Sequence, residues 1–182
     1  MVMRNKNTKT LVMNALLLGV GAMLHQITPA LGLPMQPDFA LAMLFIIIIL
    51  NDGNYKTTLI SGIVTGIFTA MTTKFPGGQL PNLIDKIVTA HIIFLLILLI
   101  NKILKEMDDR KKRLIQCFII LPIGTFVSGS LFLGSALMIV GLPAPFIALF
   151  TTVVLPAVVI NLAVGVTLYK IVEKSLKIAV AK

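Results

Sequence analysis

The sequence predicts an all-α integral membrane protein, a six-helix transmembrane bundle with both termini in the cytoplasm. Three observations lead to this prediction. The chain has 182 residues, of which 57% are hydrophobic and only 13% are charged, and its mean hydropathy is +0.99. Soluble proteins carry roughly 25% charged residues, so a soluble domain of this size lacks the polar side chains to cover so much apolar surface. The apolar residues gather into six runs, and most basic residues fall between those runs.

Six apolar stretches approach the roughly 20 helical residues that cross a bilayer core of about 30 Å. The predicted spans are residues 11–27, 37–50, 57–73, 83–100, 114–140 and 146–169. The second span is short, so reaching full depth places Asp38 just inside its outer end. The fifth is long and contains Pro122, and Pro156 is expected to bend the sixth. No separate soluble domain is visible, so we expect one membrane domain over residues 1–182.

Basic residues predict the orientation. All but Lys74 and Lys86 of the 16 basic residues lie in the two terminal segments and in the loops after the second and fourth spans. The positive-inside rule then places both termini in the cytoplasm, as an even number of spans requires. The net charge of +9 therefore indicates anionic lipid headgroups and not nucleic acid as the partner. Alternatively, the basic start followed by apolar residues 11–24 is a signal peptide, whose removal leaves five spans against this charge pattern.

A glycine- and proline-rich segment, Phe75–Lys86, runs directly into the fourth span and supplies its charged residues. On a helix, Asn82, Asp85, Lys86 and Thr89 lie within an arc of about 80°. Because adjacent helical residues do not face one another, we expect Asp85 and Lys86 to find separate partners. An acid and a base complement an amino-acid zwitterion, which predicts a small-solute site at the outer surface. The alternative is that Asp85 caps the helix while Lys86 extends to the membrane surface.

Other polar residues near the outer side are candidates for the same site. His25 and Asp38 end the first span and begin the second, so they line one mouth unless they pair with each other or with Lys86. Asn161 lies in the middle of the sixth span, where we expect it either to line the deep part of the pocket or to form an interhelical hydrogen bond. His91 lies opposite the polar stripe and is expected to pack between helices. The proline-rich outer loops form a rigid pocket wall or merely end the helices.

Small residues four positions apart permit close helix approach, inside the bundle or against a partner. Such pairs are Ala15 with Gly19 and Gly62 with Gly66. Cys117 lies in an apolar run and is expected to serve packing alone. The chain has no phosphate-binding loop and no H-E-x-x-H or G-x-S-x-G motif, and its two histidines lie on separate spans. The sequence therefore predicts no ATP hydrolysis, no enzyme activity, no cofactor and no metal site.

Motifs spread over residues 9–169 carry a family resemblance. They are A-L-L-L-G-V-G-A-M-L-H (15–25), M-Q-P-D (35–38), G-I-V-T-G-I (62–67), F-P-G-G-Q-L-P-N-L-I-D-K (75–86), I-V-G-L-P (139–143) and V-V-L-P-A (153–157). In these motifs the chain resembles the bacterial tryptophan transport protein family. That family is similar to the substrate-binding S components of energy-coupling-factor (ECF) transporters.

The resemblance implies a six-helix S component in the bacterial cell membrane that binds its substrate from outside and works with a T subunit and two ATPase subunits. Related S components contact the T subunit through an A-x-x-x-A motif on the first helix. The matching positions here are Ala15 and Gly19, so the second alanine is replaced by glycine. Three other functions remain open: an ion-coupled secondary carrier for an amino acid, an S component for a vitamin, and a membrane scaffold without a ligand.

Tryptophan suits the candidate residues, because its zwitterion binds charged groups, whereas its indole ring binds an apolar wall with a hydrogen-bond acceptor. The zwitterion is expected to engage Asp85 and Lys86, or Asp38, and the indole N–H to bond with Gln79, Asn82 or His25. Met23, Met35 and Phe39 are expected to form the apolar wall, since thioethers pack well on aromatic rings. The predicted substrate-binding residues are His25, Met35, Asp38, Gln79, Asn82, Asp85, Lys86 and Asn161.

Overall fold

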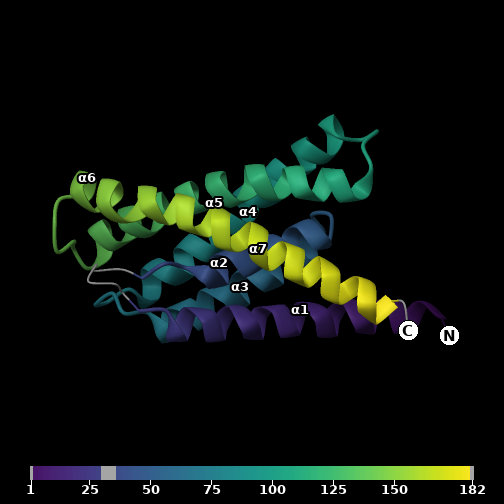
Figure 1. Cartoon of the computed structure of the whole chain (residues 1–182). Helices are drawn as coiled ribbons and strands as arrows, with labels where there is room; N and C mark the ends of the chain where they lie inside the picture. The colour runs from purple at the N-terminus through teal and green to yellow at the C-terminus, as the bar shows by residue number, and fades with distance from the viewer. Residues whose placement is uncertain (1, 30–35, 181–182) are drawn as a thin grey trace.

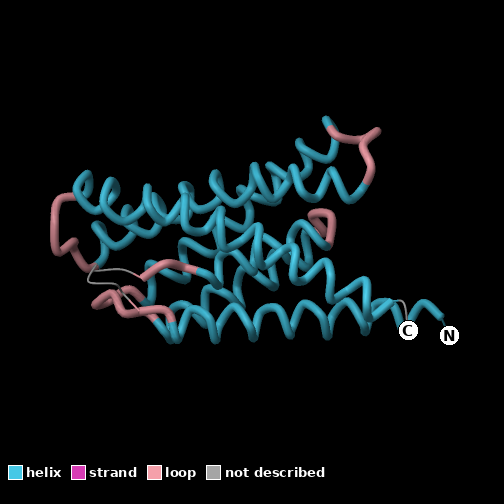
Figure 2. The backbone as a smooth tube through the Cα atoms, viewed as in Figure 1, coloured by secondary structure: helices cyan, strands magenta, loops and turns pink. Residues whose placement is uncertain are grey.

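Helices make up nearly all of the structure. The computed structural model describes residues 2–29 and 36–180, and no strand occurs among them. The helices are α1 (Val2–Ile27), α2 (Phe39–Leu50), α3 (Tyr55–Thr72), α4 (Gln79–Ile103), α5 (Asp109–Ile139), α6 (Phe146–Leu149), the π-helix η1 (Phe150–Val154) and α7 (Leu155–Val180). The last three follow one another without a break and form one rod. Figures 1 and 2 show the long helices lying lengthwise beside one another as a bundle.

The centre of the bundle is α2, which contacts α1, α3, α4, α5 and α7. Its sequence F-A-L-A-M-L-F-I-I-I-I-L is apolar all round, as expected of a helix enclosed by others. Every residue from Ala40 to Ile49 is buried. Asn51, which caps its C-terminus, exchanges two side-chain hydrogen bonds of 3.0 and 3.3 Å with Asn14 of α1. Because neighbouring helices surround α2, its 12 residues need not cover a full bilayer thickness.

Glycine allows α3 to lie directly against α4. A Cβ atom at Gly62 would lie 2.6 Å from Cβ of Ala90 and 3.3 Å from the carbonyl oxygen of Lys86. The neighbouring small residues Ser61 and Gly66 are also buried. The sequence left open whether Gly62 and Gly66 pack inside the bundle or against a partner. The structure shows that this face of α3 packs inside the bundle.

We expect the substitution Gly62→Ala to destabilise the protein by about 1–3 kcal/mol, because the added methyl group must push α3 and α4 apart. The matched control is Gly19→Ala on α1, where a Cβ atom would meet nothing within 4 Å. Thermal unfolding in detergent compares the two variants. Gly62→Ala should lower the melting temperature and Gly19→Ala should not. Equal melting temperatures would contradict the close contact of α3 with α4.

The two ends of the bundle differ in composition. At one end, here named the loop end, lie the connections α1–α2, α3–α4 and α5–α6, on the left of Figure 1. The two chain ends and the α4–α5 connection lie at the opposite end, here named the basic end. Lys102, Lys105 and Arg113 belong to the segments around that connection, and Lys170 and Lys174 to the last turns of α7.

The helices extend beyond the predicted spans, because polar helical turns continue past the apolar runs. Thus α5 begins at Asp109 and α7 continues to Val180. By length and composition, four segments within the described residues are able to cross a membrane: Thr8–Ile27, Gln79–Ile103, Asp109–Ile139 and Phe146–Lys177. Helix α2 is apolar but shorter than these, and α3 is not among them, since threonine, serine and glycine lower its hydropathy.

Pro156 affects the rod in the way its chemistry predicts. Proline has no N–H to donate and its ring collides with the carbonyl group four residues earlier. The turn directly before it, Phe150–Val154, widens into a π-helix, with the N–H of Leu155 donating to the carbonyl of Phe150. The side chains of Val153 and Val154 are buried there. Such π-turns often occur at functional sites.

Candidate functional site

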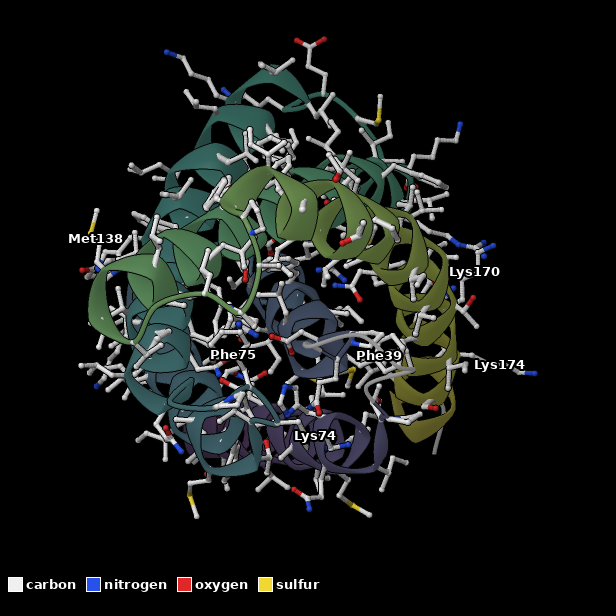
Figure 3. All side chains as sticks on the ribbon, turned by 90° about the vertical axis from the view of Figure 1, so that its left-hand side faces the viewer. Phe39, Lys74, Phe75, Met138, Lys170 and Lys174 are labelled. Carbon is white, nitrogen blue, oxygen red and sulfur yellow. The ribbon has the colours of Figure 1, made fainter. Side chains whose placement is uncertain are left out.

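A cavity of about 70 Å³ lies at the loop end of the bundle. Figure 3 looks onto this end: the labelled Lys74 and Phe75 lie around the middle of the view, and Met138 and Lys170 near its margins. Side chains from α1, α2, α4, α5, η1 and α7 meet here with residues from two connections. The lining residues are His25, Gln36, Asp38, Leu41, Thr73, Lys74, Phe75, Asn82, Asp85, Lys86, Thr125, Ser128, Gly129, Phe132, Val153, Val154, Ala157 and Asn161.

Three charged residues in contact form one wall of this cavity. Nζ of Lys86 donates to Oδ2 of Asp38 at 2.7 Å and also to Oδ2 of Asp85. We name Asp38, Asp85 and Lys86 the charge triad; its formal charge is −1. The side chains of Lys86 and Asp85 are 2% and 1% exposed, against 19% for Asp38. The triad taken alone has one negative charge in excess, which favours a cationic group beside it.

The expectation that Asp85 and Lys86 do not pair with each other was wrong, and so was the alternative that they serve the helix end and the membrane surface. The two residues do bond to each other, because the long lysine side chain reaches back around its own helix. Lys86 is buried, so it does not extend to the surface. The N-cap of α4 is Gly78, with no side-chain hydrogen bond, so Asp85 does not cap the helix.

The two carboxylates of the charge triad differ in what else they bind. Asp85 also accepts hydrogen bonds of 2.8 Å from Oγ1 of Thr89 and from Oγ of Ser128, so Lys86 and two hydroxyl groups surround it. From the described residues, Asp38 accepts one further bond, from the N–H of Leu41 at 2.9 Å, as the N-cap of α2. Asp85 therefore holds Lys86 in place, whereas Asp38 is the carboxylate that a solute can reach.

His25, Gln36 and Lys74 stand at the mouth of the cavity. The hydroxyl of Thr72 donates to a backbone carbonyl in its own helix, so at 2.7 Å it accepts from Nδ1 of His25. Nε2 of Gln36 then donates to the other ring nitrogen of His25 and to its carbonyl oxygen, at 3.0 and 2.7 Å. Lys74 donates to the carbonyl of Thr28 and has no carboxylate partner among the described residues. The mouth thus offers a second cation beside the charge triad.

Apolar side chains form the rest of the wall. The rings of Phe75 and Phe132 pack edge to face, with their centroids 5.4 Å apart and their planes at 87°. Val153 of η1 belongs to the same buried cluster. Asn161 of α7 lines the cavity and donates from Nδ2 to Oγ1 of Thr125 at 3.2 Å. The cavity therefore combines a charged side, an aromatic side and one deep amide.

Comparison with known proteins identifies the family. The model of the family described as "Tryptophan transporter TrpP" matches residues 7–177. The chain belongs to this family. Together with the apolar helices, membership makes it a multi-pass membrane protein, and a transporter family weighs against an enzyme.

Relatives in the TrpP family match almost end to end. The chain is 64% identical to a probable tryptophan transport protein of Clostridium perfringens, over 94% of each chain. It is 51% identical to a protein of the same description in Clostridium acetobutylicum, over 94% of this chain and 96% of the relative. A third, in Bacillus subtilis, is 46% identical over 93% and 94%. No solved structure matches the chain.

Most of the predicted site residues of this TrpP-family chain meet in the cavity. Those that line it are His25, Asp38, Asn82, Asp85, Lys86 and Asn161. Gln79 is exposed in the first turn of α4 and is not among the lining residues. Met35 lies outside the described residues. The expected apolar wall was wrong for Met23, which is 68% exposed, and Phe39 does not line the cavity either.

Several lining residues were missed from the sequence. On α5, Thr125, Ser128, Gly129 and Phe132 follow the i, i+3, i+4, i+7 spacing of one helix face, and this spacing was a usable signal. Gln36, Lys74 and Phe75 lie in or beside the family motifs but carry no helical periodicity, because they belong to connections between helices.

Two other predictions concern the outer faces of the helices. His91 lies away from the cavity, where its Nε2 is 3.0 Å from the hydroxyl of Tyr55, as expected of a histidine that packs between helices. Ala15 is exposed and Gly19 half-buried on α1, so this small-residue pair does not pack closely inside the bundle.

Proposed function

We propose that this chain is the substrate-specific membrane subunit of a tryptophan uptake system. It binds tryptophan from the outer face and works with a T subunit and two ATPase subunits, as an ECF S component does. The observation that carries the proposal is a buried charge triad with an excess negative charge, beside an aromatic wall, in a chain of the TrpP family. Such a wall suits an indole, and such a triad suits an ammonium group.

The proposed topology is one domain of six membrane helices in the bacterial cell membrane, with the basic end in the cytoplasm. The basic residues around the α4–α5 connection and in the last turns of α7 belong to that end, in agreement with the positive-inside rule. The cavity then faces outward. Ala15 and Gly19, on a face of α1 that no other helix covers closely, are the proposed contact with the T subunit.

The zwitterion is proposed to bind between the mouth residues and Asp38. Asp38 is the accessible carboxylate, and Oε1 of Gln36, which has no partner within residues 2–29 and 36–180, supplies a second acceptor for the ammonium group. Lys74 pairs with no carboxylate in the described part of the chain and is positioned to take that of the substrate. The indole is then left to the aromatic side, between Phe75 and Phe132. Because an indole ring is larger than the cavity, its entry has to move lining side chains apart.

We expect Lys74→Gln to lower the affinity for L-tryptophan by about tenfold, since one charge-assisted hydrogen bond is lost. The same variant should bind tryptamine, which has no carboxylate, as well as the wild type does. Lys56→Gln, at the basic end, is the matched control and should change neither value. Equal losses for tryptophan and tryptamine would show that Lys74 does not bind the carboxylate.

Reconstitution in proteoliposomes tests the division of labour. The chain alone is expected to bind labelled tryptophan but not to accumulate it under an imposed proton or sodium gradient. Accumulation should require a T subunit, the ATPases and ATP. A secondary carrier is the rival, because a triad with an excess negative charge also suits a coupling cation. Gradient-driven accumulation by the chain alone would establish that rival and contradict the proposal.

A further inference from the structure

The amide of Asn161 carries an acceptor that the protein leaves unused. Its side chain is 1% exposed, and its Nδ2 donates to Oγ1 of Thr125. Its Oδ1 has no hydrogen-bond partner among the described residues. A buried acceptor without a partner has lost its bonds to water and gained nothing in return, which is unfavourable. Such an atom in a residue that lines a cavity therefore points to a donor on a ligand.

The position of this acceptor sets it apart from other unpaired buried atoms. Oxygen atoms of Thr58, Thr65 and Gln116 are also without a partner among the described residues, but none of these residues lines the cavity. Gln36 does line it, at the mouth beside His25. Asn161 lies farther along the rod, after the π-helix. Among the described residues, the cavity thus offers one free buried acceptor near its mouth and one farther along the bundle.

The surroundings of Asn161 limit the kind of donor that fits. Phe132, Val153, Val154 and Ala157 also line the cavity, and their side chains provide only carbon atoms. Thr125, the other polar group there, already accepts from the amide of Asn161. A ligand portion that suits these surroundings is therefore apolar and carries a single hydrogen-bond donor.

We infer that Oδ1 of Asn161 accepts a hydrogen bond from the indole N–H of bound tryptophan. The inference rests on the proposed function and extends it to the side chain of the substrate. The indole nitrogen is a donor and never an acceptor, so it matches a bare amide oxygen. A site built around such a bond rejects an analogue without the donor, because the buried oxygen is then left unpaired. Asn161 is thus a specificity-determining residue.

A pair of ligands with nearly the same shape tests this bond. In 3-benzothienyl-L-alanine a sulfur atom replaces the indole N–H, while the zwitterion is unchanged. The wild-type protein is expected to bind it about 10- to 100-fold more weakly than L-tryptophan, the loss of one buried hydrogen bond. Equal dissociation constants for the two ligands would overturn the inference while leaving tryptophan binding intact. Failure to bind either amino acid would overturn the proposed function, and this inference with it.

Variants assign the preference to one residue. In Asn161→Leu, the acceptor is removed at similar volume and the indole N–H is left unpaired, so the ratio of the two dissociation constants should fall to about 1 or below. Asn14→Leu makes the same change at another buried asparagine, on the face of α1 that meets Asn51, and should keep the wild-type ratio. A wild-type ratio in Asn161→Leu would overturn the inference. If that variant does not fold, the wild-type ratio alone still decides.

Discussion

The substitution Asp38→Asn is expected to lower the affinity for L-tryptophan by about 100-fold, because the accessible carboxylate of the charge triad is lost. The fold should survive this change. Asparagine caps a helix about as well as aspartate, so the bond to the N–H of Leu41 is kept. Lys86 also keeps a counter-ion in Asp85. Isothermal titration of the purified variant measures the affinity, and its melting temperature reports the fold.

Asp85→Asn tests the charge argument from the other side. This change also brings the formal charge of the triad from −1 to zero, so tryptophan affinity should again fall sharply while expression is unchanged. Asp52→Asn is the matched control, because Asp52 is exposed in the α2–α3 connection. Wild-type affinity in Asp38→Asn would remove that residue from the site. Wild-type affinity in Asp85→Asn would show that the excess charge does not matter.

The substitution Lys86→Met is expected to have the largest effect on stability. It leaves the buried carboxylate of Asp85 and the partly exposed one of Asp38 without the cation that both contact, which costs about 3–5 kcal/mol. The expected result is a strongly reduced yield of monodisperse protein and a lower melting temperature in detergent. Lys170→Met, which removes an exposed lysine from α7, should behave like the wild type.

A second change should rescue the first. In Lys86→Met combined with Asp85→Asn, the only remaining charge of the triad is Asp38, which is partly exposed to solvent. The double variant should therefore recover a large part of the lost stability. A wild-type melting temperature in Lys86→Met alone would contradict a structural role for the lysine. No recovery in the double variant would show that repulsion between the carboxylates is not the cause of the loss.

Much of the fold follows from the distribution of apolar residues, and its limits have physical reasons. The apolar runs located each helix, but not where it begins, because polar turns such as Asp109–Arg113 continue α5 beyond its apolar part. The proline at 156 indicated an irregular sixth helix but not its form, since a bend and a π-turn both relieve the same collision.

The site was predictable where it lies on a helix. Helical spacing brought Asn82, Asp85, Lys86 and Thr89 to one face, and all four are buried. Helical spacing did not show that Lys86 bonds to Asp85 and Asp38 at once. Spacing gives only the direction of the Cα–Cβ bond, and the long, flexible lysine side chain can bend away from that direction. Residues from connections, such as Lys74, depend on tertiary structure that no periodicity encodes.

The central claim is that this chain by itself binds tryptophan, and equilibrium binding to the purified protein in nanodiscs tests it most directly. The chain contains no tryptophan, so indole fluorescence reports the ligand alone. We predict saturable binding of L-tryptophan without ATP or a coupling ion. Tryptamine, which lacks the carboxylate, and indole-3-propionate, which lacks the ammonium group, should both bind more weakly than L-tryptophan. Riboflavin should not compete with L-tryptophan. Absence of saturable tryptophan binding, or equal binding of indole-3-propionate, would contradict the account.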